Sequence, residues 1–361
     1  MYNVFIDSNI NLLHEVLKDI ANINLFDGKN LSNQELIDKN CEILFVRSTT
    51  KVNEQLLRNT YVKFVATATT GIDHVDLNYL NKNNIIFYDA AGSNSNSVAE
   101  YVFYVIFKWI IEKKIKLNDL KIGIIGFGRI GKKVANFSHI MNAQIFVNDP
   151  PLKSTDYLFP DYVNYVEIEE LLENCNIITN HVPLTSDGNY PTTNLLNYNL
   201  LKLINDNSLL IHTSRGSIIN EKDLLRFMEN KQISAAIDVW ENEPNPNCFL
   251  IEKCFFATPH IAGYSYNGKL NSSLLMAKYF EEYTKLKLNY DIILNELDKN
   301  KCLSITDNLD FNNIYQKIKN NRLLDLDNDF LKFVCKSNLD IKTEFTKYRK
   351  KYPIRYETII F

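Results

Sequence analysis

The chain has 361 residues, of which 45% are hydrophobic and 23% are charged, and its formal net charge is -3. This composition is typical of a globular protein, and the small net charge gives no overall electrostatic attraction to nucleic acid. The length is sufficient for two or three domains, each with its own buried core. The longest apolar stretch, Val98–Ile111, is too short to cross a membrane and contains two charged residues, so it predicts a buried helix.

The cysteines are spread along the chain without a C-x-x-C pair or a cluster of histidines. They are Cys41, Cys175, Cys248, Cys254, Cys302 and Cys335. The sequence therefore predicts neither a metal site nor a disulfide framework, and reduced thiols are expected. The first residues lack the basic start, apolar core and small-residue cleavage site of a signal peptide, so we expect a cytoplasmic protein.

In the first hundred residues, short apolar runs alternate with helix-like segments such as Leu12–Ile20 and Val52–Leu57. This alternation is typical of parallel β/α units. A second series of the same kind begins at Lys121 and continues to about residue 260. The sequence thus predicts an α/β protein with two parallel sheets, and the apolar helix between the two series is expected at the domain junction.

The chain changes character after about residue 290, where Asn, Lys and Asp become frequent and strand-like aromatic pieces close the sequence. A helical pattern over Leu270–Leu288 is expected to return to the first domain. We therefore expect a discontinuous domain of residues 1–97 and 264–290, a second domain of residues 98–263, and a small α+β unit of residues 291–361. The C-terminal basic run, which we interpret as a solvated face, comprises Lys347, Arg349, Lys350, Lys351 and Arg355.

The run "GFGRIG" has the G-x-G-x-x-G spacing, follows a strand-like segment and opens a helix-like one. That context predicts a pyrophosphate site at a helix N-terminus, since the glycines allow a tight turn and close approach of phosphates. Asp149 ends the next strand, where a carboxylate can bind ribose hydroxyls and repel a 2'-phosphate, so NAD is favoured over NADP. The expected cofactor residues of the turn are Gly126, Gly128, Arg129, Ile130 and Gly131.

Several chemically active side chains follow later strands of the second series. They are Arg215, Asp238, Glu241, Glu243 and His260. The carboxyl ends of parallel strands meet at one edge of a sheet, which is where ligands of such sheets bind. An arginine can hold a carboxylate with two hydrogen bonds, and a histidine moves a proton near neutral pH. A glutamate beside that histidine favours the imidazolium and fixes the ring.

The segments "IGIIGFGRIG", "HVPLT", "SRGSIIN", "DVWENEP" and "TPHIAG" together resemble the D-2-hydroxyacid dehydrogenase family, over about 280 residues in chain order. The resemblance implies a flavodoxin-like substrate domain and an NAD-binding Rossmann domain. It also implies that Arg215, Glu243 and His260 form a catalytic triad. The positions that it assigns to the cofactor, besides the glycine turn, are Asp149, Ser214, Asp238 and Gly263.

Other segments, including "TATTGIDHVD", the "DGNYPT" insertion and "HIAGYSYNGK", resemble one branch of this family that acts on a phosphorylated sugar acid. The resemblance assigns Ser48, Thr69 and Tyr264 to the substrate, and Arg47 offers a charge nearby. It further implies a C-terminal dimerisation domain and a homodimer. Capping of helices by Ser48 and Thr69, and core packing of Tyr264, stay open as structural alternatives.

The implied reaction is oxidation of a C2 hydroxyl, in which His260 is the general base and Glu243 holds its ring. Arg215 is expected to bind the substrate carboxylate. A cleft between the domains is expected to close over both ligands. The chain departs from the family pattern at Ala91, Ser93 and His212. We expect His212 to be buried in its strand and assign it no catalytic role. The alternatives are a phosphoglycerate or glyoxylate/hydroxypyruvate reductase, and an NAD-sensing binding protein.

Overall fold

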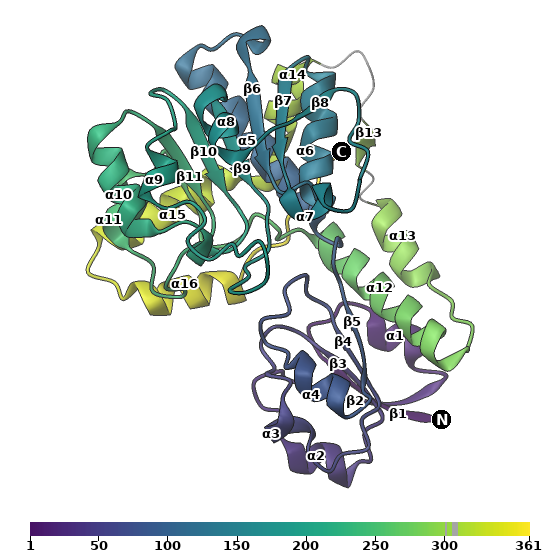
Figure 1. Ribbon diagram of the computed structural model, residues 1–361. Helices are drawn as coiled ribbons and strands as arrows, with labels where there is room; N and C mark the ends of the chain where they lie inside the picture. The colour runs from purple at the N-terminus through teal and green to yellow at the C-terminus, as the bar shows by residue number, and fades with distance from the viewer. Residues whose placement is uncertain (300–301, 305–309) are drawn as a thin grey trace. The chain divides into compact units, whose positions relative to one another are not determined.

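The computed structural model describes residues 1–299, 302–304 and 310–361. Contacts within the chain divide it into two compact units (Figure 1). The first unit comprises Met1–Asn94 and Tyr264–Lys301, and the second comprises Ser95–Gly263 and Cys302–Phe361. The first unit is therefore built from two separate stretches of the chain.

The first unit contains a five-stranded sheet in which all neighbouring strands are parallel. Its strands are β1 (Tyr2–Asp7), β2 (Ala21–Phe26), β3 (Ile43–Val46), β4 (Phe64–Thr67) and β5 (Ile86–Asp89). Their spatial order is β2-β1-β3-β4-β5, which is the flavodoxin-like order. The predicted parallel sheet and its flavodoxin-like class are confirmed.

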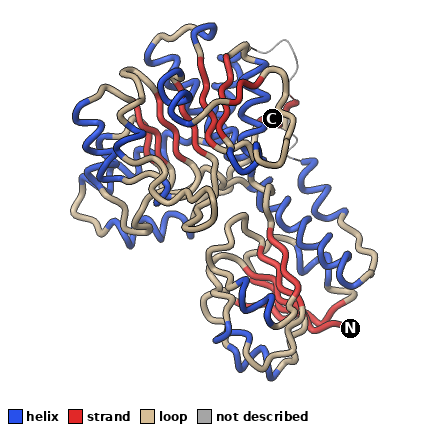
Figure 2. Tube along the Cα trace, viewed as in Figure 1, coloured by secondary structure: helices blue, strands red, loops and turns tan. Residues whose placement is uncertain are grey.

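Helices cover both faces of this sheet (Figure 2). They are α1 (Leu13–Leu17), α2 (Asn33–Asp38), α3 (Glu54–Leu57), α4 (Leu77–Lys82) and α12 (Tyr266–Thr284), whereas α13 (Asp291–Lys299) packs against α12. Alternate residues of β1 point to opposite faces: Val4 and Ile6 pack with α1 and α12, whereas Phe5 packs with α2, α3 and α4. Since both faces are covered, the central strands β3 and β4 are fully buried and almost entirely apolar.

The second unit contains a seven-stranded parallel sheet with the order β12-β11-β10-β9-β6-β7-β8. Its strands are β6 (Lys121–Ile125), β7 (Gln144–Asn148), β8 (Val163–Tyr165), β9 (Ile177–Asn180), β10 (Leu209–His212), β11 (Ser234–Ile237) and β12 (Phe256–Ala257). The order reverses between β6 and β9, so the carboxyl ends of these two strands flank a topological switch point, where ligands of such sheets bind. The second predicted parallel sheet is confirmed.

The helices of the second unit lie on both faces of its sheet (Figure 2). They are α5 (Ser95–Lys113), α6 (Arg129–Ile140), α7 (Pro150–Lys153), α8 (Ile168–Asn174), α9 (Tyr198–Leu201), α10 (Glu221–Asn230), α11 (Cys248–Lys253), α14 (Phe311–Arg322), α15 (Leu324–Lys336) and α16 (Ile341–Lys350). The apolar run at Val98–Ile111 lies in α5, which is buried against α6 and α14, as expected of a core helix. Across the described part of the chain, no helix combines the length and apolar character needed to span a bilayer.

The C-terminal segment differs from the prediction in both its secondary structure and its place. The sequence predicted a separate α+β unit over residues 291–361, but residues 302–361 group with the second unit and are mainly helical. The only strand pair described there joins β13 (Leu303–Ser304) to β14 (Ile359–Ile360) in parallel. The closing run "KYPIRYETIIF", predicted to be strand-like, begins directly after α16, and within it only Ile359–Ile360, which form β14, are strand.

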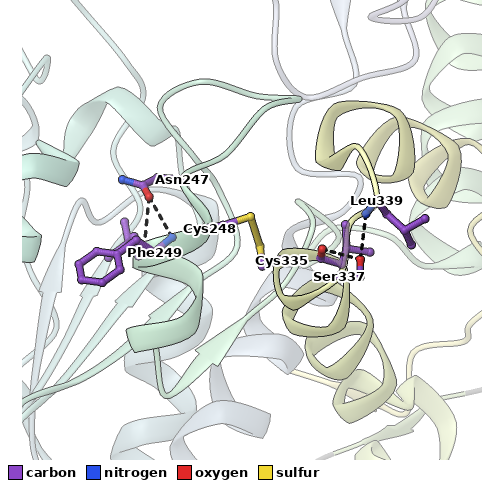
Figure 3. Close-up of a disulfide and its surroundings, with 8 residues drawn as sticks. Asn247, Cys248, Phe249, Cys335, Ser337 and Leu339 are labelled. Carbon is purple, nitrogen blue, oxygen red and sulfur yellow. Dashed lines mark hydrogen bonds between the residues drawn. A yellow bond between two sulfur atoms is a disulfide. The ribbon is translucent and has the colours of Figure 1, made fainter.

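A disulfide joins Cys248 at the start of α11 to Cys335 near the end of α15 (Figure 3). The expectation of reduced thiols throughout was therefore wrong for this pair. The two cysteines are separated by 87 residues, and only the packing of α11 against α15 brings them together. Their spacing in the sequence carried no sign of this contact, because connectivity of distant cysteines cannot be read from spacing.

A buried ion pair fixes the C-terminal strand to the second unit. Arg322 of α14 and Glu100 of α5 are both fully buried, with 3.2 Å between Nη1 and Oε1. The other oxygen of Glu100 accepts hydrogen bonds from the backbone N–H groups of Thr358 and Ile359. Arg322 also donates to the backbone carbonyl of Ala262, 3.1 Å away, two residues after His260. The C-terminal segment thus supports the chain next to the candidate site.

Candidate active site

The glycine-rich turn connects β6 to α6 and leaves open space where a phosphate is expected. Gly126 has φ +91°, and a Cβ built on Gly131 would lie 2.1 Å from the Gly126 carbonyl oxygen, so neither position admits a larger residue without rearrangement. A Cβ built on Gly128, in contrast, meets no atom within 4 Å. The turn is therefore tightly packed on the protein side and open at Gly128.

The first turn of α6 presents backbone donors at this open side. Gly128 is the N-cap and provides no side-chain cap, and the first backbone hydrogen bond of the helix runs from Lys132 to Gly128. Among the described residues, none accepts a hydrogen bond from the backbone N–H groups of Arg129, Ile130 or Gly131. Unsatisfied N–H groups at a helix N-terminus bind phosphate oxygens, so these residues fit a dinucleotide pyrophosphate.

Asp149 follows β7 and borders the glycine-rich turn. One carboxylate oxygen accepts a hydrogen bond from the backbone N–H of Phe127 at 2.7 Å, and the other caps α7 by accepting from Leu152 at 2.9 Å. Each carboxylate oxygen has a second lone pair for a further donor. Asp149 is thereby fixed beside the turn with acceptor capacity left for ribose hydroxyls, which fits the predicted role.

His260 and Glu243 form a hydrogen-bonded pair at the carboxyl edge of the seven-stranded sheet. His260 follows β12, Glu243 follows β11, and their Nδ1 and Oε2 atoms are 2.7 Å apart. The His260 backbone has φ +56°, a left-handed conformation that is uncommon for a residue with a side chain and recurs at functional sites. Their side chains are 31% and 20% exposed, so the pair is accessible from one side.

Glu243 stays ionised because its surroundings favour the carboxylate. Burial raises the pKa of Glu243, but the charge and hydrogen bond of His260 and the charge of Arg349 outweigh burial, and the pKa ends below its ordinary value. The other oxygen, Oε1, accepts a hydrogen bond from the backbone N–H of Trp240 at 2.9 Å. An ionised Glu243 accepts a hydrogen bond from the N–H at Nδ1, which leaves Nε2 of His260 as the basic nitrogen.

Arg215 follows β10, the strand between β9 and β11. Its Nη1 donates to the Ser214 carbonyl oxygen at 2.8 Å. The next residue, Gly216, packs so closely on the backbone of Trp240 that a Cβ would lie 2.0 Å from its carbonyl carbon. This contact holds the chain around Arg215 against the loop that carries Glu243.

Asp238 fixes the loop around His260 through hydrogen bonds to its carboxylate. It is 1% exposed, and its Oδ1 accepts hydrogen bonds from Thr258 and from the backbone of Ile261, while Oδ2 accepts from Ala262. Burial raises the pKa of Asp238, although the charge of His260 and these hydrogen bonds act in the opposite direction. Asp238 was predicted as a cofactor residue, and the contacts of its side chain are to the loop on either side of His260.

Two histidines lie at the ends of β9 and β10, His181 partly buried and His212 buried, and neither was predicted as part of the site. Burial, followed by the charge of the other histidine, lowers the pKa of His181 to about 3. Burial also lowers the pKa of His212 to about 4. The expected burial of His212 in its strand is confirmed, and its Nδ1 faces Asn180 and Ser214 at 3.3 and 3.4 Å. Ser214, a predicted cofactor residue, is itself buried.

Replacing His212 with asparagine reduces the acid sensitivity of folding. The pKa of His212 is about 4 in the folded protein and about 6.5 in the unfolded chain. Between these values the unfolded state binds more protons, so the free energy of unfolding falls as the pH decreases. Between pH 7 and pH 5, the free energy of unfolding of the original chain should fall about 2 kcal/mol more than that of the variant. Urea unfolding at both pH values measures this, with His14→Asn, whose side chain is 40% exposed, as the control. Equal pH dependence of His212→Asn and the original chain contradicts it.

The three predicted substrate residues belong to the first unit. Ser48 follows β3 and is exposed, and Thr69 follows β4. The last residues of these two strands, Val46 and Thr67, are paired, so Ser48 and Thr69 lie at one edge of the five-stranded sheet. Thr69 donates to the Gly71 carbonyl oxygen, and neither residue is the N-cap of a described helix, so the capping alternative is wrong. Tyr264 is partly exposed just before α12, and Gly263, a predicted cofactor residue, is partly buried.

Comparisons with known proteins extend this description. Residues 107–262 match the family model described as the D-isomer specific 2-hydroxyacid dehydrogenase, NAD binding domain. The fold is similar to D-lactate dehydrogenase from Aquifex aeolicus, solved with NAD and lactic acid, with a TM-score of 0.66, 24% identity, and coverage of 82% of this chain and 98% of that one. The 3-phosphoglycerate dehydrogenase of Entamoeba histolytica, solved with NAD+, has a TM-score of 0.65, 25% identity, and coverage of 78% and 95%.

Curated relatives are closer in sequence. The erythronate-4-phosphate dehydrogenase of Hahella chejuensis is 38% identical over 287 residues, which cover 79% of this chain and 73% of the relative. The enzyme of the same name from Wigglesworthia glossinidia brevipalpis is 34% identical over 353 residues, which cover 96% of this chain and 91% of the relative. The chain therefore belongs to the erythronate-4-phosphate dehydrogenases, within the D-2-hydroxyacid dehydrogenase family.

Proposed function

We propose that this protein is an NAD-dependent erythronate-4-phosphate dehydrogenase of the cytoplasm. It oxidises the C2 hydroxyl of 4-phospho-D-erythronate to the ketone of 3-hydroxy-2-oxo-4-phosphobutanoate, a step of pyridoxal 5'-phosphate biosynthesis. The proposal is supported by the relatives described above. The observation that carries it is the pairing of His260 with Glu243 at 2.7 Å, on the sheet edge that also holds the glycine-rich turn.

His260 acts as general base in this reaction. With Nδ1 bound to the Glu243 carboxylate, Nε2 accepts the proton of the C2 hydroxyl, and Glu243 stabilises the imidazolium that forms. Bound NAD+ would supply the acceptor for the hydride that leaves C2 with its electron pair. Removal of a proton from oxygen and a hydride from carbon gives the ketone.

Arg215 holds the substrate carboxylate and polarises the oxygen on C2 as it becomes a carbonyl. Ser48, Thr69 and Tyr264 of the first unit bind the rest of the substrate, with Arg47 as the nearest cation in sequence to Ser48. The first-turn N–H groups of α6 would hold the cofactor pyrophosphate, and Asp149 would hold the ribose. Ser214, Asp238 and Gly263 also belong to the cofactor site. Asp238 contributes by accepting hydrogen bonds from the backbone of Ile261 and Ala262, which fixes the loop that follows His260.

The protein is further proposed to act as a homodimer through its C-terminal segment. Support comes from large apolar side chains exposed on and near α15 and α16, an arrangement typical of interfaces. They include Leu326 at 56%, Phe333 at 63% and Leu339 at 50% exposure. Sedimentation at increasing protein concentration tests the proposal; a monomer at all concentrations contradicts it.

The substrate assignment is tested by NADH formation with 4-phospho-D-erythronate, 3-phosphoglycerate, glycerate and lactate in parallel. A 2-oxo acid is added to matched samples in case bound NADH is not released. The proposal predicts that kcat/KM is highest for the four-carbon phosphate. A higher value for another acid contradicts the substrate, whereas no turnover with any of them, together with tight NAD binding, supports an NAD-sensing protein instead.

A further inference from the structure

Arg349 of α16 lies next to the carboxylate that holds the catalytic histidine. Its Nη1 is 3.8 Å from Oε2 of Glu243, the same oxygen that pairs with Nδ1 of His260. The Arg349 side chain is 29% exposed, so its charge is partly shielded from water. The basic run of the C-terminal segment was interpreted as a solvated face, and Arg349 departs from that interpretation.

Helix α16 is held rigidly enough to place this charge. The hydroxyl groups of Tyr348 and Tyr352 both donate to the carboxylate of Asp327 on α15, at 2.5 and 2.9 Å. Tyr348 also stacks on Phe330 of α15, with ring centroids 3.9 Å apart. Phe345, one turn before Arg349, is 1% exposed and belongs to the core of the second unit.

Helix α15 is in turn attached to the strand and helix that precede His260. The side-chain oxygen of Asn328 accepts a hydrogen bond from the backbone of Ala257, three residues before His260. Lys332 donates to the Cys254 carbonyl oxygen at 2.7 Å, and the disulfide of Figure 3 joins Cys335 to α11. A continuous set of contacts therefore runs from the chain before His260 through α15 to α16 and Arg349.

The charge of Arg349 is opposite to that of most ionisable groups around the pair. The neighbouring groups are mostly acidic. Asp238 at the end of β11 interacts electrostatically with His260, and Glu221 of α10 interacts with Glu241 and Glu243 of the loop. His212 of β10 is buried in its neutral form. Carboxylates near an imidazole favour its protonated form, in which it cannot act as a base. A neighbouring cation opposes that effect.

We propose that Arg349 is a positioning residue for the catalytic pair: it holds the Glu243 carboxylate and offsets its charge, which disfavours the imidazolium form of His260. This role rests on the proposed function, because it concerns the base of that reaction. It also gives the C-terminal segment a part in catalysis within a single chain.

Replacing Arg349 with methionine removes the cation and keeps the length of the side chain. The imidazolium of His260 then becomes more favourable, and the acidic limb of the pH profile of kcat/KM for oxidation moves to higher pH. The expected shift is roughly 0.5 to 1 pH unit. Arg349→Lys keeps the charge and restores most of the original profile. NMR titration of the His260 ring without substrate should give the same shift.

Lys350→Met is the matched control, because it removes one positive charge from the same helix at an exposed position. Its profile and imidazole titration should match the original protein. Equal shifts in the Arg349 and Lys350 variants, or no shift in Arg349→Met, overturn the proposal. Arg349→Gln replaces Arg349→Met if the latter does not fold. If 4-phospho-D-erythronate is not oxidised by the original protein, the proposed function fails, while the ring titration still decides the role of Arg349.

Discussion

Replacing His260 with asparagine lowers kcat for oxidation of 4-phospho-D-erythronate by roughly 100-fold to 10,000-fold, the range expected for loss of a general base. Asparagine can still accept a hydrogen bond but cannot take up the hydroxyl proton near neutral pH. The affinity for NAD should change little, because the residues proposed to bind the cofactor, the glycine-rich turn and Asp149, follow other strands of the sheet. Stopped-flow detection of NADH with saturating substrate measures the chemical step.

Glu243→Gln serves as the companion variant for this experiment. It keeps the size of the side chain but loses the charge that fixes the His260 ring and stabilises its imidazolium. Its kcat should also fall, with NAD affinity retained. If kcat of the His260 variant stays within a factor of three of the original protein, His260 is not the base.

Arg322→Met should lower the free energy of unfolding by about 3 to 5 kcal/mol, the range observed when one partner of a buried ion pair is removed. The variant leaves Glu100 without its buried cation and removes the donors to the carbonyl groups of Ser97 and Ala262. Glu100 already has a pKa raised to about 7, since burial outweighs the charge of Arg322. Urea unfolding of the full chain at pH 7 measures the effect.

Lys317→Met is the matched control, since Lys317 is exposed on the same helix and has the same charge. Its free energy of unfolding should change by no more than about 0.5 kcal/mol. The double variant Arg322→Met with Glu100→Leu should recover part of the loss, because the uncompensated carboxylate is gone. A loss below about 1 kcal/mol in Arg322→Met contradicts this role of the pair.

The two parallel sheets could be predicted because their signals are local. Each buried strand is a short apolar run, and each run is followed by a helical pattern or a turn, as at Lys121–Ile125 and the glycine-rich turn. The helices of the C-terminal segment could not be predicted in the same way. Their apolar faces are interrupted by Asn, Lys and Asp, and their stability comes from packing on distant elements such as α5 and α11.

The proximity of Glu243 to His260 could be predicted for a related reason. In a parallel sheet the ends of successive strands meet at one edge, so Glu243 and His260 were expected together from their places in the chain. The contacts that support them were not predictable, because they join residues far apart in sequence. Arg349 and Glu243, or Arg322 and Glu100, come together only in the folded chain. The supporting role of Asp238 was likewise visible only from its contacts with Ile261 and Ala262.

The most direct test of the proposed reaction follows the hydrogen on C2. 4-Phospho-D-erythronate carrying deuterium at C2 is incubated with the protein and NAD+, and the reduced cofactor is analysed by mass spectrometry and NMR. Hydride transfer from C2 predicts one deuterium on the nicotinamide ring and a slower chemical step than with unlabelled substrate. Reduced cofactor without deuterium would show that oxidation occurs at another carbon, and the roles given to His260 and Arg215 would then be wrong.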